Sequence, residues 1–338
     1  MIDISKDSLR EFLQEKTSSC KILVVGDIML DKYLYGEVTR ISAEAPVPIT
    51  RVNSSTEKLG GAANIAYNLA VLGCKVSIAG FVGADVHCNS LIKKLHEHDI
   101  DAAGLIKTTR PTTTKVRVIS GNQQMFRLDF EETRKIEDNF AEKLQDYVAA
   151  RLNESLDCII ICDHDNGACT EKTVAKIIEL GHNHGVPVIV DMSCNNWINY
   201  KHADCVVANM KRINKQLLQP IENEDTLVEK AGHYLLRKFH IKSVVATRSE
   251  LGLSLIGNDR TVHIPTKAQE LFDVLGATDA VTAVMAMSLA GGLKSEAGAY
   301  LANLAASKVV TKLGTYAVTI EELKTLLDSD DSLGLRYN

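Results

Sequence analysis

The regular alternation of short apolar runs with longer helical patterns is the feature that most constrains the fold of this chain. From residue 136 onward, runs rich in Val and Ile alternate with stretches whose apolar residues recur at helical spacing. A strand–helix–strand rhythm of this kind predicts an α/β fold with a doubly wound, mainly parallel sheet. The expected strands are 158–162, 186–190, 203–208, 243–247 and 253–256, and the expected helices are 138–152, 171–184, 222–239 and 295–313.

The first half of the chain predicts a smaller β-sheet beside the main one. Residues 49–52 alternate like a half-exposed strand, and residues 112–129 follow a hairpin pattern. We expect these segments to form a β-strand lid from about 33–52 and about 110–130. Because unpaired strand edges readily pair with another chain, we also expect a homodimer through lid strands 49–52 and 113–119.

Length and composition bound the class of protein. The 338 residues contain no internal repeat, which predicts a single domain over 1–328 and a polar, frayed tail at 329–338. A net charge of -5 without a basic stripe argues against nucleic-acid binding. No apolar run approaches the roughly 18–20 residues that span a bilayer, so no membrane insertion is expected. The amphipathic segment 1–16 does not resemble a signal peptide.

The cysteines and histidines do not predict a metal site. Eight cysteines are scattered without a C-x-x-C pair, which indicates free thiols and a cytoplasmic location. His164, His182 and His184 are interpreted as loop or surface residues. No G-x-G-x-x-G follows the first expected strand, 21–27, which argues against a dinucleotide-dependent oxidoreductase.

Polar residues stand where the predicted strands end. Asp27 is the last residue of the expected strand 21–27, and Asp31 lies four residues later. In open α/β sheets, ligands bind at the carboxyl ends of the strands, so both acids are candidate ligand contacts. Capping of a turn is the alternative role for each. The residues expected to meet at this edge are Asp27, Asp163, Asp191, Asn209, Thr247 and Asp279.

The stretch 272–280 predicts a phosphate-binding turn. Small residues at Gly276 and Ala277 precede Asp279, and a helical pattern follows at 281–289. The start of a helix offers unpaired backbone N–H groups and the positive end of the helix dipole, which together bind phosphate. A carboxylate at that place can take a proton from a hydroxyl group. The stretch therefore indicates phosphoryl transfer to an alcohol.

A Gly-Gly pair opens a second helical pattern. Gly60 and Gly61 would allow a ligand to approach the backbone closely, and Asn64 could hydrogen-bond a sugar hydroxyl group one turn into the helix. Close packing of the helix against its neighbours explains the glycines equally well.

Several motifs resemble those of the ribokinase-like (PfkB) carbohydrate kinases, and in particular the members that phosphorylate heptose 7-phosphate. The resemblance extends from about residue 21 to about residue 323, without a nucleotidyltransferase half after it. The motifs are Gly26 to Tyr33, Arg40 to Pro48, Gly60 to Asn64, Asn122 to Asp129, Thr247 to Glu250 and Pro265 to Glu270.

This resemblance implies a fold, a reaction and a set of residues. It implies a ribokinase-like sheet with a β-strand lid, and an enzyme that uses ATP and Mg²⁺ to phosphorylate the anomeric hydroxyl of heptose 7-phosphate, toward ADP-heptose and lipopolysaccharide. Asp279 would be the general base, and the backbone of Gly276, Ala277 and Thr278 would form the anion hole. The implied sugar-binding residues are Asp27, Asp31, Gly60, Gly61, Asn64 and Arg127. The implied nucleotide-binding residues are Asn209, Thr247, Gly252 and Asn303.

Four positions on the phosphate side depart from the family pattern. Thr278 replaces a glycine, Arg212 replaces a glutamate, and Ser193 and Asn166 replace lysines. Thr278 would be strained if its φ were positive, whereas a relaxed helical backbone would indicate a remodelled anion hole. Two interpretations remain open. The protein is a kinase in which Mg²⁺ is held through water and ATP oxygens and Lys211 or Arg212 contacts phosphate, or it is a non-catalytic member that binds a sugar phosphate or a partner protein.

Overall fold

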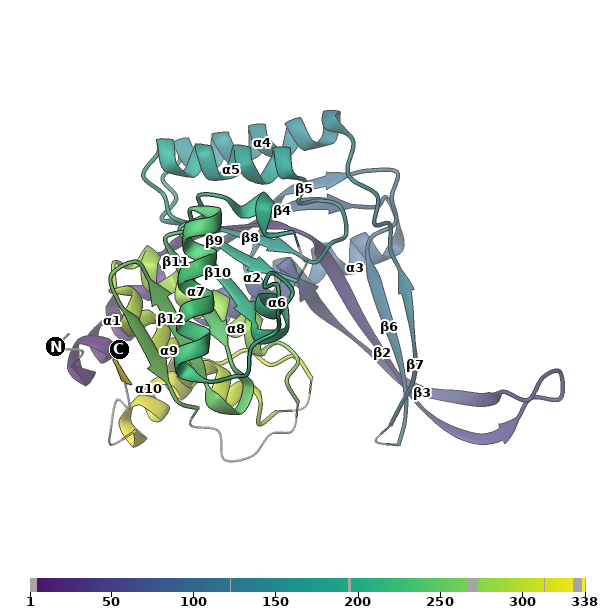
Figure 1. Cartoon of the computed structure of the whole chain (residues 1–338). Coiled ribbons are helices and arrows are strands. Elements are labelled where there is room, and N and C mark those ends of the chain that lie inside the picture. Colours follow the sequence, from purple (N-terminus) through teal and green to yellow (C-terminus); the bar gives the residue numbers. More distant parts are fainter. Residues whose placement is uncertain are drawn as a thin grey trace.

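A large sheet forms the centre of the protein (Figure 1). The computed structural model describes residues 5–121, 123–193, 196–266, 273–312, 314–330 and 336–337. Within these residues, the strand order of the large sheet is β14-β13-β12-β11-β10-β9-β8-β1-β4-β5. The strands are β1 Lys21–Gly26, β4 Lys75–Val82, β5 Asp101–Lys107, β8 Cys158–Asp163, β9 Val188–Met192, β10 Cys205–Asn209, β11 Ser243–Thr247, β12 Leu253–Gly257, β13 Thr261–Ile264 and β14 Arg336–Tyr337.

The pairing is parallel from β5 to β11 and antiparallel from β11 to β14. This arrangement agrees with the expected α/β fold and its mainly parallel sheet. The carboxyl ends of β1, β8, β9, β10 and β11 therefore lie along one edge of the sheet, as parallel strands require.

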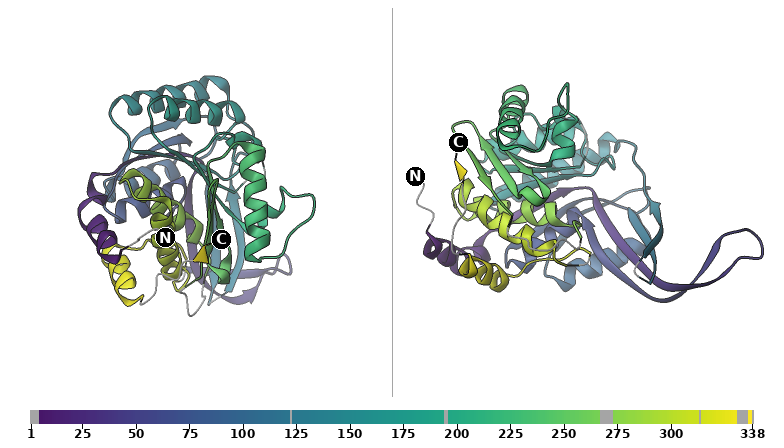
Figure 2. Two further views of the ribbon diagram at one scale, coloured as in Figure 1. Left: turned by 60° about the vertical axis from the view of Figure 1, so that its left-hand side comes forward. Right: turned by 60° about the horizontal axis from the view of Figure 1, so that its bottom comes forward.

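Helices cover both faces of the large sheet (Figures 1 and 2). Successive residues of a strand point to opposite faces, so Ile22 and Val24 of β1 join one apolar core while Leu23 and Val25 join the other. The first core is shared with α1 Lys6–Glu15, α2 Ala62–Val71, α3 Val86–Glu97, α8 Ala277–Ala290, α9 Ser295–Val309 and α10 Ile320–Ser329. The second core is shared with α4 Asp138–Asn153, α5 Glu171–Asn183 and α7 Asp225–Phe239.

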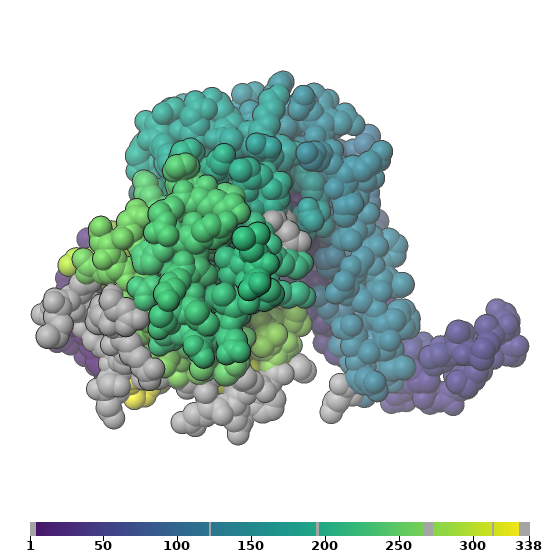
Figure 3. All heavy atoms as spheres, in the orientation of Figure 1, coloured from purple at the N-terminus to yellow at the C-terminus, as the bar shows by residue number. Residues whose placement is uncertain are grey.

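A second sheet with the strand order β3-β2-β6-β7 forms the lid. It projects from one end of the main sheet, and a groove separates it from the body in the space-filling view (Figure 3). Its strands are β2 Ile28–Ile41, β3 Pro48–Gly61, β6 Thr114–Ser120 and β7 Gln123–Phe130.

The lid differs from the expected one in extent and in its edges. It begins at Ile28 rather than near residue 33 and continues to Gly61 rather than ending near residue 52. The expected Gly-Gly turn is therefore the end of β3, where Gly60 pairs with Met29. Strand β6 lies between β2 and β7, so it has no free edge for a second subunit. The edges of this sheet are β3 and β7.

Three parts of the main sheet were not expected from the sequence. Strand β5 lies at one end of the sheet, and β13 lies next to β14 at the other. The backbone of Arg336–Tyr337 in β14 pairs with Val262 and His263, although the tail was expected to fray. These segments are short or polar, and pairing with a neighbouring strand stabilises them more than their own composition does. The start of the turn at Phe272 lies outside the described residues.

Candidate active site

Asp279 lies in the first turn of α8, where the chain crosses the ligand-binding edge of the sheet. Gly276 precedes the helix with a φ of 78°, and Thr278 and Asp279 follow inside it. The left-handed conformation is thus placed on a glycine, and Thr278 keeps an ordinary helical backbone. The strain considered for Thr278 is absent, and this helix start is relaxed.

The backbone around Asp279 presents unpaired donors. Ala277 N donates weakly to Val274 O at 3.3 Å, whereas the N–H groups of Thr278 and Asp279 have no acceptor among the described residues. Unpaired N–H groups are the normal consequence of starting a helix, and they point along the positive end of its dipole. The first turn of α8 is therefore suited to an anion.

The carboxylate of Asp279 is oriented by Asn64 from α2. Asn64 Nδ2 donates a short hydrogen bond to Asp279 Oδ2, and the Asn64 side chain is buried. Burial raises the pKa of Asp279, while the positive charge of His164 and the Asn64 hydrogen bond act in the opposite direction. Asp191 on β9 is a buried neighbour whose pKa is raised well above its ordinary value, by burial and by the charge of Asp279. Asp279 is the half-exposed acid of the two.

A cavity of about 240 Å³ opens beside the start of α8. Its wall includes Ala277 and Thr278, so an occupant would reach the unpaired N–H groups. Much of the remaining wall is apolar, as in sites for planar ring systems. All four residues expected to bind the nucleotide line this one cavity, namely Asn209, Thr247, Gly252 and Asn303.

Short loops hold this cavity open. A Cβ atom added to Gly252, which has a φ of 84°, would lie 2.1 Å from Ile264 O. The buried guanidinium of Arg248 anchors the same loop by donating to Asn223 Oδ1 at 2.8 Å and to Ser254 Oγ at 3.0 Å. Asn303 Nδ2 donates to Pro265 O at 2.8 Å and thereby fixes the opposite wall.

A charged cluster lies on one face of the lid, and the charge of its Asp31 acts on Asp279. Asp31 on β2 accepts a short hydrogen bond from Arg117 on β6, and its neighbour across the ladder is Lys58 on β3. The ring of Tyr33 lies under both cations, with its centroid 5.3 Å from the Arg117 guanidinium carbon and 5.9 Å from Lys58 Nζ. Asp31 is thus a residue of a lid strand and does not lie at the carboxyl end of a core strand.

Arg127 lies on the outermost lid strand. Its guanidinium pairs with Asp129 two residues later, with Nε 2.7 Å from Oδ1. Lys115 on β6 donates to the same acid at 3.1 Å. Arg127 opposes Arg117 across the ladder, so both belong to the face that carries Asp31.

Asp27 faces a loop of the chain rather than Asp279. Its carboxylate accepts backbone hydrogen bonds from His164 at 2.7 Å, Asn166 at 3.1 Å and Ala168 at 3.3 Å. Burial, followed by the charge of Asp163, raises its pKa to about 6. These bonds organise the segment after β8.

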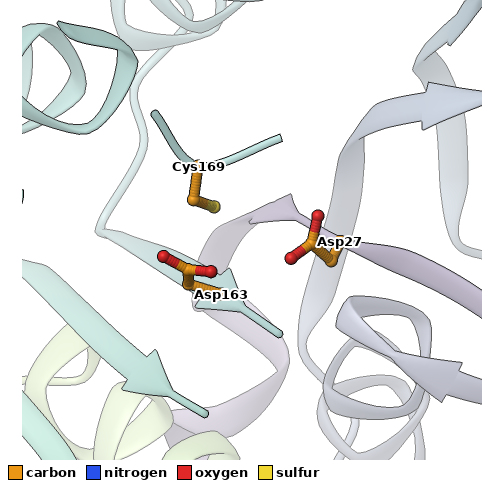
Figure 4. Close-up of side chains that lie close together, drawn as sticks. All are labelled: Asp27, Asp163 and Cys169. Atoms are coloured by element: carbon orange, nitrogen blue, oxygen red, sulfur yellow. The ribbon is translucent and has the colours of Figure 1, made fainter. Parts of the chain in front are cut away.

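Asp27, Asp163 and Cys169 converge closely (Figure 4). Their donor atoms lie within 4.8 Å of one another, which is the one such grouping found among the described residues. The carboxylates are already occupied, because Asp163 accepts from Tyr200 Oη at 2.6 Å and from Asp165 N at 2.9 Å. The grouping therefore does not fit Mg²⁺, which needs free oxygen ligands. Arg212, which occupies the position where the family pattern has an acid, follows Asn209 of the cavity and donates its backbone N–H to the Asn209 side chain at 3.0 Å.

His164 is a residue of this site that the sequence reasoning missed. Its ring lies 3.4 Å from the position of a Cβ on Gly61, and its Nε2 is buried without a hydrogen-bond partner in the described part of the protein. Its positive charge lowers the pKa of Asp279. The motif comparison marked the segment 163–167 as altered, but only the fold brings this ring to the start of α2.

Solved structures with this architecture include sugar kinases. The ribokinase of Arabidopsis thaliana, in complex with ribose and ATP, has a TM-score of 0.72 and 18% identity over 92% of this chain and 100% of its own. A tetrameric inhibited form of phosphofructokinase-2 from Escherichia coli has a TM-score of 0.74 and 15% identity, and the match covers 92% and 98% of the two chains. At such identities the likeness establishes the fold alone, which is ribokinase-like.

The sequence match is more specific than the fold. The family described as pfkB family carbohydrate kinase matches residues 20–322, so the chain belongs to this family of carbohydrate kinases, enzymes that transfer a phosphoryl group. The resemblance inferred from the motifs is thereby confirmed. The bifunctional protein HldE of Salmonella dublin is 40% identical over 90% of this chain and 62% of its own length. HldE of Actinobacillus pleuropneumoniae serotype 5b is 36% identical, covering 94% and 66%. The chain thus spans slightly less than two thirds of these relatives.

Proposed function

We propose that this protein is an ATP-dependent sugar kinase that phosphorylates the anomeric hydroxyl group of heptose 7-phosphate. The observation that carries the proposal is the position of Asp279. It follows Ala277 and Thr278, which line a cavity of about 240 Å³, it is within electrostatic range of Asp31 on the lid, and it lies beside two unpaired backbone donors. A phosphoryl donor on one side and a hydroxyl acceptor on the other would meet at this carboxylate.

In the proposed reaction, Asp279 takes the proton of the acceptor hydroxyl group. The hydrogen bond from Asn64 occupies one carboxylate oxygen, and the other would accept the proton. The raised pKa of Asp279 makes it a stronger proton acceptor than an ordinary surface carboxylate. The transferred group carries negative charge, which the N–H groups of Thr278 and Asp279 would stabilise at the start of α8.

ATP and Mg²⁺ are the proposed cofactors. The cavity lined by Asn209, Thr247, Gly252 and Asn303 would hold the nucleotide, and its apolar wall suits an adenine ring. Mg²⁺ neutralises charge on the phosphates when bound. We expect it to enter with ATP and to keep several water ligands, since the described residues offer no free cluster of acids beside the cavity.

The sugar phosphate is proposed to bind under the lid. Gly60 and Gly61 lie next to Asp31 and His164, so a substrate would contact the backbone between charged side chains. The basic residues Lys115, Arg117 and Arg127 share one face of the lid with Asp31 and Asp129, the acids that pair with them, and this charged face suits a polar substrate. The choice of a heptose 7-phosphate rests on the sequence motifs of the lid and of Gly60 to Asn64.

A non-catalytic role as a sugar-phosphate binder or protein partner is the second candidate. The presence of Arg212 in place of an acid favours it, because this position faces the nucleotide phosphates in the family pattern. The relaxed helical backbone of Thr278 indicates a remodelled anion hole, whereas the hydrogen bond between Asn64 and Asp279 favours the kinase.

Replacing Asp279 by Asn tests the proposal. We expect the wild type to bind the Mg²⁺ complex of ATP and heptose 7-phosphate and to release ADP. The variant should keep sugar-phosphate binding while kcat falls by a factor of about 10²–10⁴, the usual contribution of a general base. Calorimetry and an ADP-coupled assay give the two readouts. Turnover that survives in the variant would show that Asp279 is not the base, and a wild type that binds the sugar but no ATP would replace the kinase with the binder.

A cytoplasmic location remains part of the proposal. The described cysteines are free thiols, as expected for a reducing compartment. No helix in the described residues is long and apolar enough to cross a membrane.

A further inference from the structure

One lysine of the lid makes a contact that the proposed reaction does not explain. Lys58 Nζ donates to the backbone carbonyl of Thr315 at 3.0 Å. Lys58 belongs to β3, whereas Thr315 lies between α9 and α10 in the body of the protein. The ammonium group has no ion-pair partner among the residues that the structure describes, so the backbone contact is its principal bond.

The Thr315 segment is joined in turn to the approach of α8. Gly314 N donates to Asp273 Oδ2 at 3.0 Å, and Leu275 N donates to Asp273 Oδ1 at 3.0 Å. A Cβ atom placed on Gly276 would lie 3.7 Å from Thr315 Cα. The segment around Thr315 therefore packs directly against the turn that carries the proposed anion hole.

These contacts form a continuous path. It starts on the lid at Lys58, crosses to Thr315 and Gly314, and reaches the Asp273–Gly276 turn through the carboxylate of Asp273. Asp31, the proposed sugar contact, is the residue paired with Lys58 across β2 and β3. A ligand that orders the sugar side of the lid would thus act on the phosphate side through a single side chain.

We infer that Lys58 is a positioning residue that couples the lid to the anion-hole turn, so that sugar binding and nucleotide binding favour each other. The inference rests on the proposed function, since it takes the turn as the phosphate site. Coupling between two sites is reciprocal, so each ligand must tighten the other by the same factor.

The substitution Lys58→Met tests this coupling because it keeps an unbranched side chain only one atom shorter and removes the donor. In the wild type, heptose 7-phosphate is expected to tighten a non-hydrolysable ATP analogue at least about fivefold, and the reverse experiment should give the same factor. In Lys58→Met the factor should approach one, and in Lys58→Arg, which keeps a donor, it should be partly restored. Lys32→Met is the matched control, because Lys32 lies on neighbouring β2 and pairs with Glu57 at 3.3 Å.

Hydrogen exchange in the ligand-free protein separates this inference from the kinase proposal. Lys58→Met should accelerate exchange of the Gly314 and Leu275 amides by about fivefold or more, while Lys32→Met leaves them unchanged. If exchange at both amides stays at the wild-type rate, or if the coupling factor survives in Lys58→Met, the inferred role of Lys58 is wrong. If exchange responds but the wild type binds no ATP analogue, the contact path stands and the kinase proposal fails.

Discussion

At the scale of single residues, the ability of Asp279 to accept a proton depends on its pKa, which neighbouring groups raise and lower. Burial raises its pKa, whereas the charge of His164 and the hydrogen bond from Asn64 lower it. A base must be ionised to accept a proton, so the raised pKa moves the acidic limit of activity upward from the ordinary carboxyl range, and His164 restrains that shift.

We therefore expect the acidic limb of the pH profile of kcat/KM to depend on the charge of His164. Replacing His164 by Gln removes the positive charge that lowers the pKa of Asp279, so the acidic limb of the profile should move to higher pH. His96→Gln, an exposed histidine on α3, is the control and should reproduce the wild-type limb. A limb that moves to lower pH, or that moves equally in both variants, would contradict the role given to His164.

At the scale of elements, two tight turns decide where the cleft can form. Gly276 and Gly252 both have a positive φ, of 78° and 84°. Their surroundings differ, because a Cβ on Gly276 would make only ordinary contacts, whereas one on Gly252 would overlap Ile264 O at 2.1 Å. The first turn needs glycine for its backbone alone, and the second also for space.

Alanine substitutions should separate these two requirements. Gly276→Ala should lower the free energy of unfolding by about 1–2 kcal/mol through left-handed strain alone. Gly252→Ala should cost about 1–3 kcal/mol more, because the added carbon also displaces backbone atoms. Gly292, with a φ of 81° and no atom within 4 Å of its Cβ position, is the control and should behave like Gly276. Urea unfolding measures all three, and equal losses at Gly252 and Gly292 would refute the steric argument.

At the scale of the whole molecule, the lid leaves apolar surface uncovered. Phe126, Leu128 and Phe130 share one face of β7 and are 46%, 47% and 50% exposed. Strand β7 is an edge of the lid sheet, so its outer backbone groups are also available for pairing. We propose that a second copy of the chain covers this surface, through edge strands β3 and β7 rather than through β6.

The double substitution Phe126→Asp and Leu128→Asp tests the dimer. The wild type is expected to sediment as a dimer at low micromolar concentration and the variant as a monomer, because burying two carboxylates in an apolar interface is costly. Leu218→Asp, at a fully exposed leucine of the body, is the matched control and should remain a dimer. A wild-type protein that sediments as a monomer would show that the proposed dimer is wrong.

The binding residues that the sequence predicts fall into two groups in the structure. Asn209, Thr247, Gly252 and Asn303 share one cavity with Thr278. Asn209 and Thr247 end strands β10 and β11, Gly252 lies in the loop after β11, and Asn303 lies on helix α9, so the strand–helix rhythm already implies where the first three lie. Asp31 and Arg127 lie on lid strands, where the ion pair of Asp31 with Arg117 depends on how β2 and β6 align and Arg127 pairs with Asp129 on its own strand. Local pattern predicts the first kind of position and not the second, since register between distant strands is a tertiary property.

The sequence alone determined the doubly wound sheet, the family and the turn that bears Asp279. These follow from periodicity and from short motifs, which act over a few neighbouring residues. Only the tertiary structure decided that Gly276 rather than Thr278 adopts the left-handed conformation, that the charge of His164 acts on Asp279, and that Lys58 bonds to Thr315. These contacts join residues far apart in the chain, and packing of the whole fold is what brings them within hydrogen-bonding or electrostatic range.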